Sequence, residues 1–239
     1  ISLKGSGNLN IGKNLEDLPM ILFEKEANIN GTLTINGVPN EVRNITFKSV
    51  HLSNKGSFNI VSGKSLYIDN LEVDSYTNTE LSEIDIEKTA NINQPSTIKL
   101  YDTDFGFYST VNYKIYSFDS FDPLFIGDLN SNPQRIYLIN TDKNKKPEKN
   151  KEYTIVNGFF KRSSCINWMH SFDLSDSVFD SIECRKSSLG VTKTQSDDLP
   201  YSIILKRTKD EKKGPGGGVI AAIVIVVVVV VAAIIVGVI

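Results

Sequence analysis

The sequence predicts an all-β body, a right-handed parallel β-solenoid, followed by one C-terminal transmembrane helix. Three observations carry this prediction: short β-branched and aromatic runs closed by turn residues, a tetrapeptide that recurs at a solenoid spacing, and a 21-residue apolar run at residues 219–239. A β-sandwich of short strands is the alternative fold for the body.

Residues 1–140 are expected to form the solenoid. Runs such as residues 33–35 and 135–139 are short, rich in β-branched and aromatic residues, and bounded by Gly, Asn or Asp. The tetrapeptide Ala-Asn-Ile-Asn at residues 27–30 recurs at residues 90–93, which corresponds to three repeats of about 21 residues each. This period is typical of coils that stack their apolar side chains on the next coil.

Three further segments lie between the predicted solenoid and the apolar run. Residues 141–152 are charged and contain a proline, so they are expected to be a loop or boundary. Residues 153–205 are expected to be a β-rich capping module that contains both cysteines, and residues 206–218 a basic, glycine-rich juxtamembrane stem. No convincing amphipathic helix is found in the body, and residues 80–88 are the best candidate.

Residues 219–239 are expected to be the transmembrane helix. At about 1.5 Å per residue, 21 helical residues span roughly 31 Å, which matches the hydrocarbon core of a bilayer. The run of Val and Ile would favour a strand in water, but in lipid only a helix satisfies the backbone of a lone segment. Because the chain starts at Ile1 without a methionine and stops within this run, we expect both ends to be trimmed.

The orientation of the body is predicted from two opposing sets of residues. Basic residues precede the apolar run, and taken alone they place this flank in the cytosol, as in a tail-anchored protein. These residues are Lys206, Arg207, Lys209, Lys212 and Lys213. Glycosylation sequons at Asn30 and Asn44, and an even cysteine count, favour an extracellular body. A single-span protein with an extracellular body is preferred, with a tail anchor and a glycolipid anchor as alternatives.

Residues that could carry catalysis are few. His51 and His170 are the only histidines, and Cys165 is expected to pair with Cys184 in a disulfide rather than act as a nucleophile. Asp102 and Asp104 would share one face of a strand, as paired carboxylates of a polysaccharide-active enzyme or ligands of a calcium ion.

A solvated turn is the simpler interpretation of these two aspartates. The composition adds a further exclusion: 26 Lys and Arg against 28 Asp and Glu give none of the basic excess of a nucleic-acid-binding protein. We therefore expect no catalytic site, metal, cofactor or nucleic-acid partner.

The architecture resembles the large families of single-span surface proteins of parasitic flagellated protists. Some of these look like polymorphic membrane proteins and autotransporter passengers. The most specific part of the resemblance is residues 214–239, where Gly-Pro-Gly-Gly-Gly precedes an almost pure Val, Ile and Ala span. The resemblance implies an adhesin-like glycoprotein of the plasma membrane that contacts a host or extracellular protein or glycan. A membrane-tethered polysaccharide enzyme and a tail-anchored cytosolic protein are the alternative functions.

Overall fold

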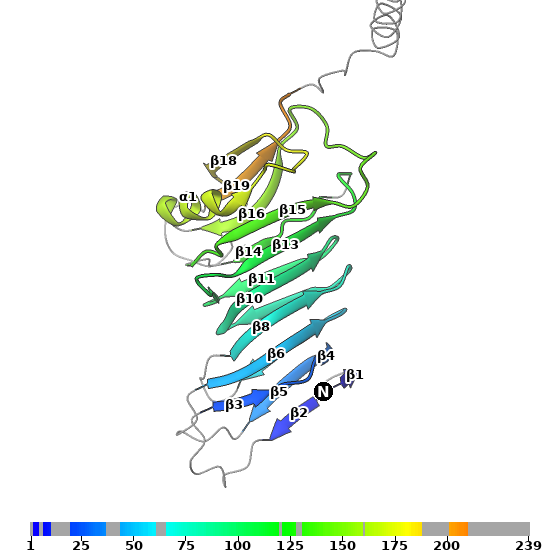
Figure 1. Cartoon of the computed structure of the whole chain (residues 1–239), viewed down its shortest axis with the longest axis vertical. Helices are drawn as coiled ribbons and strands as arrows, with labels where there is room; N and C mark the ends of the chain where they lie inside the picture. The colour runs from blue at the N-terminus through cyan, green and yellow to red at the C-terminus, as the bar shows by residue number, and fades with distance from the viewer. Residues whose placement is uncertain are drawn as a thin grey trace, which may run out of the picture. The chain divides into compact units, whose positions relative to one another are not determined.

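The computed structural model describes residues 2–4, 7–10, 20–36, 44–60, 66–119, 121–127, 131–159, 161–187 and 201–209. These residues form a β-solenoid of about five coils whose parallel strands are stacked like rungs (Figure 1). Because every neighbouring pair in its largest sheet is parallel, the β-solenoid prediction is confirmed and the β-sandwich alternative is wrong.

Three sheets form the sides of the solenoid. The long sheet contains β1 (Ser2–Lys4), β4 (Ala27–Asn30), β6 (Asn44–Leu52), β8 (Leu66–Val73), β10 (Ile84–Asn93), β13 (Thr110–Ile115), β15 (Arg135–Asn140) and β17 (Phe172–Asp173), with β3 (Met20–Phe23) and β12 (Asp104–Phe105) paired beside it. A three-stranded sheet contains β2 (Gly7–Asn10), β5 (Thr32–Asn36) and β7 (Ser57–Ile60). A six-stranded sheet contains β9 (Asn78–Ser82), β11 (Thr97–Tyr101), β14 (Phe125–Gly127), β16 (Tyr153–Phe159), β19 (Tyr201–Lys206) and β18 (Ser181–Lys186).

The recurring tetrapeptide occupies the same place in coils that are three apart. Ala27 pairs with Val50, Val50 with Leu71, and Leu71 with Ala90. These three register pairs connect the first copy of the tetrapeptide to the second. The number of residues between paired positions differs: it is largest for the first pair and smallest for the last. The period inferred from the sequence is therefore confirmed as an average, while individual coils vary in length.

The core consists of columns of apolar side chains that run through the coils. Alternation along each strand directs one set of side chains inward, as in the burial pattern of β13, where every second residue is buried. One inward column contains Ala27, Val50, Leu71, Ala90, Val111 and Ile136, none of them more than 1% exposed. Each side chain thus packs on its neighbours in the coils before and after it.

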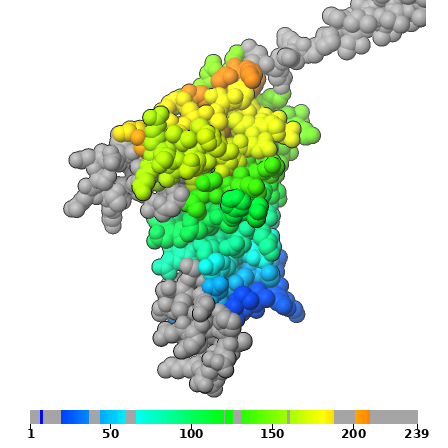
Figure 2. Space-filling model, turned by 60° about the vertical axis from the view of Figure 1, so that its left-hand side comes forward, coloured from blue at the N-terminus to red at the C-terminus, as the bar shows by residue number. Residues whose placement is uncertain are grey.

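The C-terminal end of the stack changes from parallel to antiparallel pairing. β19 pairs antiparallel with both β16 and β18, and helix α1 (Arg162–Ser171) packs on these strands. Figure 2 shows these residues, coloured yellow-green to orange, covering the end of the stack beyond the green coils. The sequence predicts a β-rich module here. The strands agree with that prediction, but helix α1 was not expected.

Helix α1 lacks the usual sequence signals of a helix. It has no acidic residue in its first turn and no side chain that caps its N-terminus, so the sequence alone gave no reason to expect it. Burial of Cys165 and Trp168 holds it in place instead. The weak helix candidate at residues 80–88 is wrong, because these residues belong to β9, a turn and β10.

The predicted transmembrane helix at residues 219–239 lies outside the described residues. Within the described ranges, no helix is both long enough and apolar enough to cross a membrane. Residues 1–208 make up one compact unit, and residues 209–239 make up a second. The charged segment 141–152 is therefore a loop inside the first unit, mostly exposed and without a named strand.

Candidate functional site

Seven polar side chains form a column on the outer face of the long sheet, which we call the polar ladder. They occupy one register position on successive parallel strands, and each is exposed or half-buried. In chain order they are Asn28, His51, Glu72, Asn91, Asn112, Tyr137 and Asp173. At about 4.8 Å between neighbouring strands, the ladder extends roughly 29 Å along the solenoid.

Side-chain contacts between coils hold parts of the ladder in place. Asn112 Nδ2 donates a hydrogen bond to Asn91 Oδ1 at 2.8 Å, and His51 Nδ1 lies 3.1 Å from Asn28 Oδ1. The other ring nitrogen, His51 Nε2, lies 2.9 Å from Asp74 Oδ1, within ion-pair distance but without hydrogen-bond alignment. These contacts fix the outward groups at the spacing of the strands, as stacked amides do in other in-register sheets.

Two shallow hollows lie along the ladder, each with a volume of about 430 Å³. The first is beside the N-terminal half and is lined by His51, Glu72, Asn91, Ser49, Asn70 and Asp74. The second is beside the C-terminal half and is lined by Asn112, Tyr137, Asp173, Ile139, Lys143 and Asp176. The ladder therefore presents amide, imidazole, phenol and carboxylate groups along a surface that is hollowed in two places.

The two aspartates selected from the sequence do not form a pair on one strand. Asp102 lies in a bend with a φ of 44°, whereas Asp104 lies in β12. Asp104 is instead in register with Asp85, which belongs to the preceding coil. Burial, together with the charge of Asp104, raises the pKa of Asp85, although a hydrogen bond from Tyr67 opposes this shift. Sequence reasoning missed this pair, and the coil spacing was the signal that could have revealed it.

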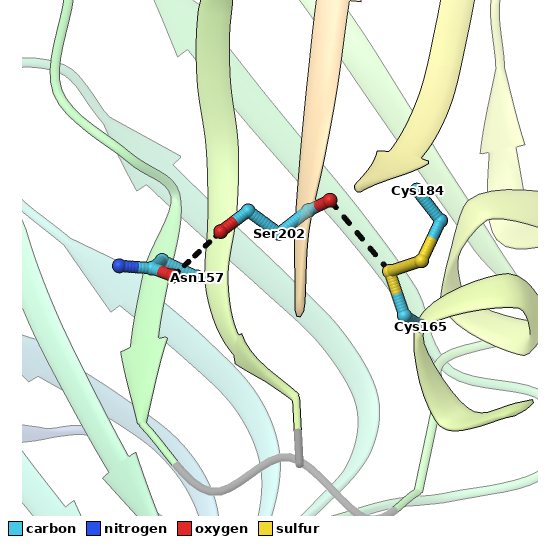
Figure 3. The surroundings of a disulfide bond; sticks show 4 residues. All are labelled: Asn157, Cys165, Cys184 and Ser202. Atoms are coloured by element: carbon cyan, nitrogen blue, oxygen red, sulfur yellow. Dashed lines mark hydrogen bonds between the residues drawn. A yellow bond between two sulfur atoms is a disulfide. The ribbon is translucent and has the colours of Figure 1, made fainter. Parts of the chain in front are cut away.

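The cysteines are joined in a disulfide between α1 and β18, as Figure 3 shows. Cys165 is fully buried and its Sγ lies 3.7 Å from the carbonyl oxygen of Ser202, a packing contact because the bonded sulfur carries no hydrogen. Ser202 Oγ in turn donates to Asn157 Oδ1 at 2.6 Å. A disulfide cysteine is no nucleophile, so the spacing of Cys165 and His170 on α1 does not make a catalytic pair.

The other residues selected from the sequence fall at separate places. Asn30 and Asn44, the two glycosylation candidates, are half-buried at the end of β4 and the start of β6. Lys206 is the last residue of β19, and its Nζ lies 3.0 Å from Glu152 Oε1. Arg207 donates from Nη1 to the carbonyl of Pro147 at 3.1 Å.

Lys206 and Arg207 therefore belong to the folded body, so the expected stem cannot begin at residue 206. Lys209 is the last described residue, and Lys212 and Lys213 lie outside the described residues. The part that these basic residues play as the flank of a membrane anchor stays a prediction.

A buried carboxylate links three successive coils. Asp69, whose side chain is 8% exposed, accepts hydrogen bonds on Oδ2 from Lys48 Nζ and Lys88 Nζ, each at 2.8 Å. Burial alone would raise the pKa of Asp69, but the hydrogen bonds and charges of the two lysines outweigh it and hold the pKa below its ordinary value. We call this group the Asp69 clasp; its contacts join β6, β8 and β10.

In the ranges that the structure describes, no three His, Cys, Asp or Glu residues are grouped so that they could hold a metal ion. No family model, no curated protein and no solved structure matches the chain.

Proposed function

We propose that the chain is a membrane-anchored cell-surface protein whose solenoid presents the polar ladder for adhesion or contact with a host or other extracellular partner, without catalysis. The observation that carries the proposal is the ladder itself, seven polar side chains in one register column with a hollow beside each half. A long face of this kind suits a partner that binds through many shallow contacts rather than in one deep pocket.

Two features support an external location at the plasma membrane. The disulfide between Cys165 and Cys184 is of a kind that persists in oxidising compartments. The apolar run at residues 219–239 has the length and composition of a membrane anchor. Asn30 and Asn44 are not fully buried, so both sequons are candidates for a glycan.

The location is tested on intact cells that express the tagged full-length gene. External protease is expected to remove the body, and glycosidase digestion is expected to increase its electrophoretic mobility. If the body is protected and carries no glycan, the protein faces the cytosol as a tail-anchored protein and the proposed function is wrong.

The ladder is tested by the adhesion of cells that display the full-length protein. Asn112→Arg places a long cation in the ladder, whereas Asn78→Arg makes the same change on an exposed position of β9 in the six-stranded sheet. We expect Asn112→Arg to reduce adhesion at least several-fold and Asn78→Arg to leave it unchanged. Equal adhesion by both variants would remove the ladder from the proposed function.

The register pair of Asp85 and Asp104 favours one second candidate, a membrane-tethered polysaccharide-active enzyme. General acid–base hydrolysis of a glycoside uses two neighbouring carboxyl groups, and the pKa of Asp85 is raised by burial and by the charge of Asp104, as suits a general acid. Release of reducing ends from polysaccharides by the wild type, abolished by Asp85→Asn and by Asp104→Asn, would establish this activity. Absence of release, or release that both variants retain, would eliminate it.

A further inference from the structure

Two aromatic side chains project from a turn between β12 and β13. Phe107 is 80% exposed and Tyr108 is 75% exposed, and their rings meet edge to face with centroids 4.9 Å apart. Full burial of one such side chain is worth about 1.5–3 kcal/mol. A neighbouring pair left in solvent is therefore a candidate contact surface. We call residues 106–109 the aromatic turn.

The aromatic turn is fixed to the coils on both sides. The Gly106 amide donates to the carbonyl of Ile86 in the preceding coil, and the Gln134 amide of the following coil donates to the carbonyl of Ser109, each at 2.9 Å. A Cβ atom on Gly106 would lie 2.5 Å from the carbonyl oxygen of Glu87, so the turn is pressed against the preceding coil. Such anchoring lowers the ordering cost of binding.

A hollow of about 500 Å³ opens beside the aromatic turn, bounded by Phe105 and Phe107, the segment 131–134 and helix α1. Its volume is within the usual range for small-molecule sites. The polar groups on its wall are hydroxyls, amides and one imidazole: Ser131, Asn132, Gln134, Asn167, His170 and Ser171.

Three of these side chains have unused hydrogen-bonding capacity. Gln134, Asn167 and His170 are exposed, and their side chains make no hydrogen bond to another group in the described part of the chain. No Asp, Glu, Lys or Arg is among the described residues that line the hollow. The wall therefore offers donors and acceptors without a fixed charge.

We infer that this hollow binds an uncharged carbohydrate, with a sugar ring packed against the aromatic turn and its hydroxyls facing the amides and the imidazole. The C–H groups on one face of a pyranose are apolar and fit an aromatic ring, while its hydroxyls both donate and accept hydrogen bonds and so match the amides and hydroxyls of the wall. An anionic glycan would find no Lys or Arg among the described residues that line the hollow, and the carboxylate of Glu87 beside Gly106 would disfavour its charge. The site is separate from the polar ladder and does not depend on where the protein resides.

Trp168 supplies a built-in reporter of binding. It is the only tryptophan in the sequence, is fully buried, and meets Phe105 edge to face with ring centroids 5.3 Å apart. Because Phe105 also lines the hollow, a bound sugar is expected to change the tryptophan fluorescence. Titrations would use the full-length chain in a detergent whose head group contains no sugar.

The probes are oligosaccharides of three or four units of glucose, mannose, galactose or N-acetylglucosamine, with oligogalacturonate and a heparin fragment as anionic comparators. We expect saturable binding of at least one neutral probe, with a Kd between about 10 μM and 1 mM, as expected for few and shallow contacts.

Phe107→Ala/Tyr108→Ala is expected to weaken binding of that probe at least about tenfold, because the ring of Phe107 on the wall and the Tyr108 ring packed against it are both lost. Gln134→Ala and Asn167→Ala remove unpartnered exposed side chains, so each is expected to weaken binding by about three- to tenfold without lowering the melting temperature.

Tyr76→Asn is the matched control. Tyr76 is an 81% exposed tyrosine on another turn, and asparagine tolerates its φ of 64°. Binding by this variant is expected to stay within about twofold of wild type, a difference below about 0.5 kcal/mol.

Three outcomes would overturn the inference. The first is that no neutral probe binds at about 5 mM, which is well above the expected Kd. The others are tighter binding of the anionic comparators, and equal binding by the double variant and the wild type. Each outcome is independent of the surface-protease experiment, so failure of the inference is distinguishable from failure of the proposed function.

Discussion

The Asp69 clasp provides the sharpest test of how the coils are held together. Asp69→Asn keeps the shape of the side chain but removes the charge that faces Lys48 and Lys88. Because both lysines donate to one oxygen, and an amide oxygen also has two lone pairs, the hydrogen bonds can be kept and the substitution isolates the contribution of the charge. We expect a loss of stability without a change of fold.

The size of this loss of stability depends on how strongly solvent screens the Asp69–Lys48 and Asp69–Lys88 ion pairs. A hydrogen bond to a charged group contributes about 1.5–3 kcal/mol when buried, and an exposed ion pair about 0.2–1 kcal/mol. The Asp69 side chain is only 8% exposed, but those of Lys48 and Lys88 are 46% and 60% exposed. Discounting for the solvent around the lysines, we expect Asp69→Asn to lower the free energy of unfolding by about 1–2 kcal/mol.

The stabilisation by the ionised Asp69 side chain should decrease as the pH is lowered. The pKa of Asp69 is lower in the folded protein than its ordinary value of 3.8, so its stabilisation is present above that pH and is lost as the pH falls towards the folded-state pKa. The difference between wild type and Asp69→Asn is therefore expected to be constant near neutrality and to shrink below about pH 4.

Chemical denaturation of the full-length chain at pH 7 and at pH 3 measures both effects. Glu80→Gln is the control, because the Glu80–Lys99 pair also joins neighbouring coils but is 3.9 Å long and largely exposed. We expect it to cost less than about 0.5 kcal/mol. If Asp69→Asn is no more destabilising than Glu80→Gln at pH 7, the clasp does not hold the coils together.

Three further predictions concern the cap, the aromatic turn and the carboxylate pair. Cys165→Ala/Cys184→Ala opens a link between residues 19 apart and should cost about 3 kcal/mol in denaturation, and reductant should destabilise only the wild type. Gly106→Ala should lower the melting temperature by several degrees, because its new Cβ meets backbone rather than a movable side chain. Burial and the charge of Asp104 raise the pKa of Asp85, so the ionised side chain destabilises the fold. Asp85→Asn should therefore be more stable than wild type by a few tenths of a kcal/mol at pH 7, and this gain should be absent at pH 3. A gain that persists at pH 3 would contradict this cause.

The repeating part of the fold was predictable, and the cap was only partly so. The Ala-Asn-Ile-Asn repeat revealed the coil period because stacked coils impose the same inward and outward pattern at each turn. Helix α1 was not predictable, because its position depends on burying Trp168 and on the link from Cys165 to Cys184. Tertiary contacts of this kind leave little trace in a 3.6-residue pattern.

The polar ladder was not predictable, although its members were visible one by one. Its residues are of five types, and the spacing between neighbours along the chain is almost twice as long from Tyr137 to Asp173 as from Glu72 to Asn91. No motif has a spacing that varies so widely. The register is set by backbone hydrogen bonds and by turns of different length, and the same variation concealed the pairing of Asp85 with Asp104.

The direction of the strands also determines how the body would respond to a pulling force. The backbone hydrogen bonds that join coils run along the stack, so tension between its two ends loads one interface at a time instead of shearing all of them together. A released coil of about 21 residues could extend by up to about 75 Å at the reach of an extended chain. In the antiparallel cap, the covalent link between α1 and β18 prevents the chain between Cys165 and Cys184 from extending. We therefore expect the body to lengthen in discrete steps under load, about one coil at a time.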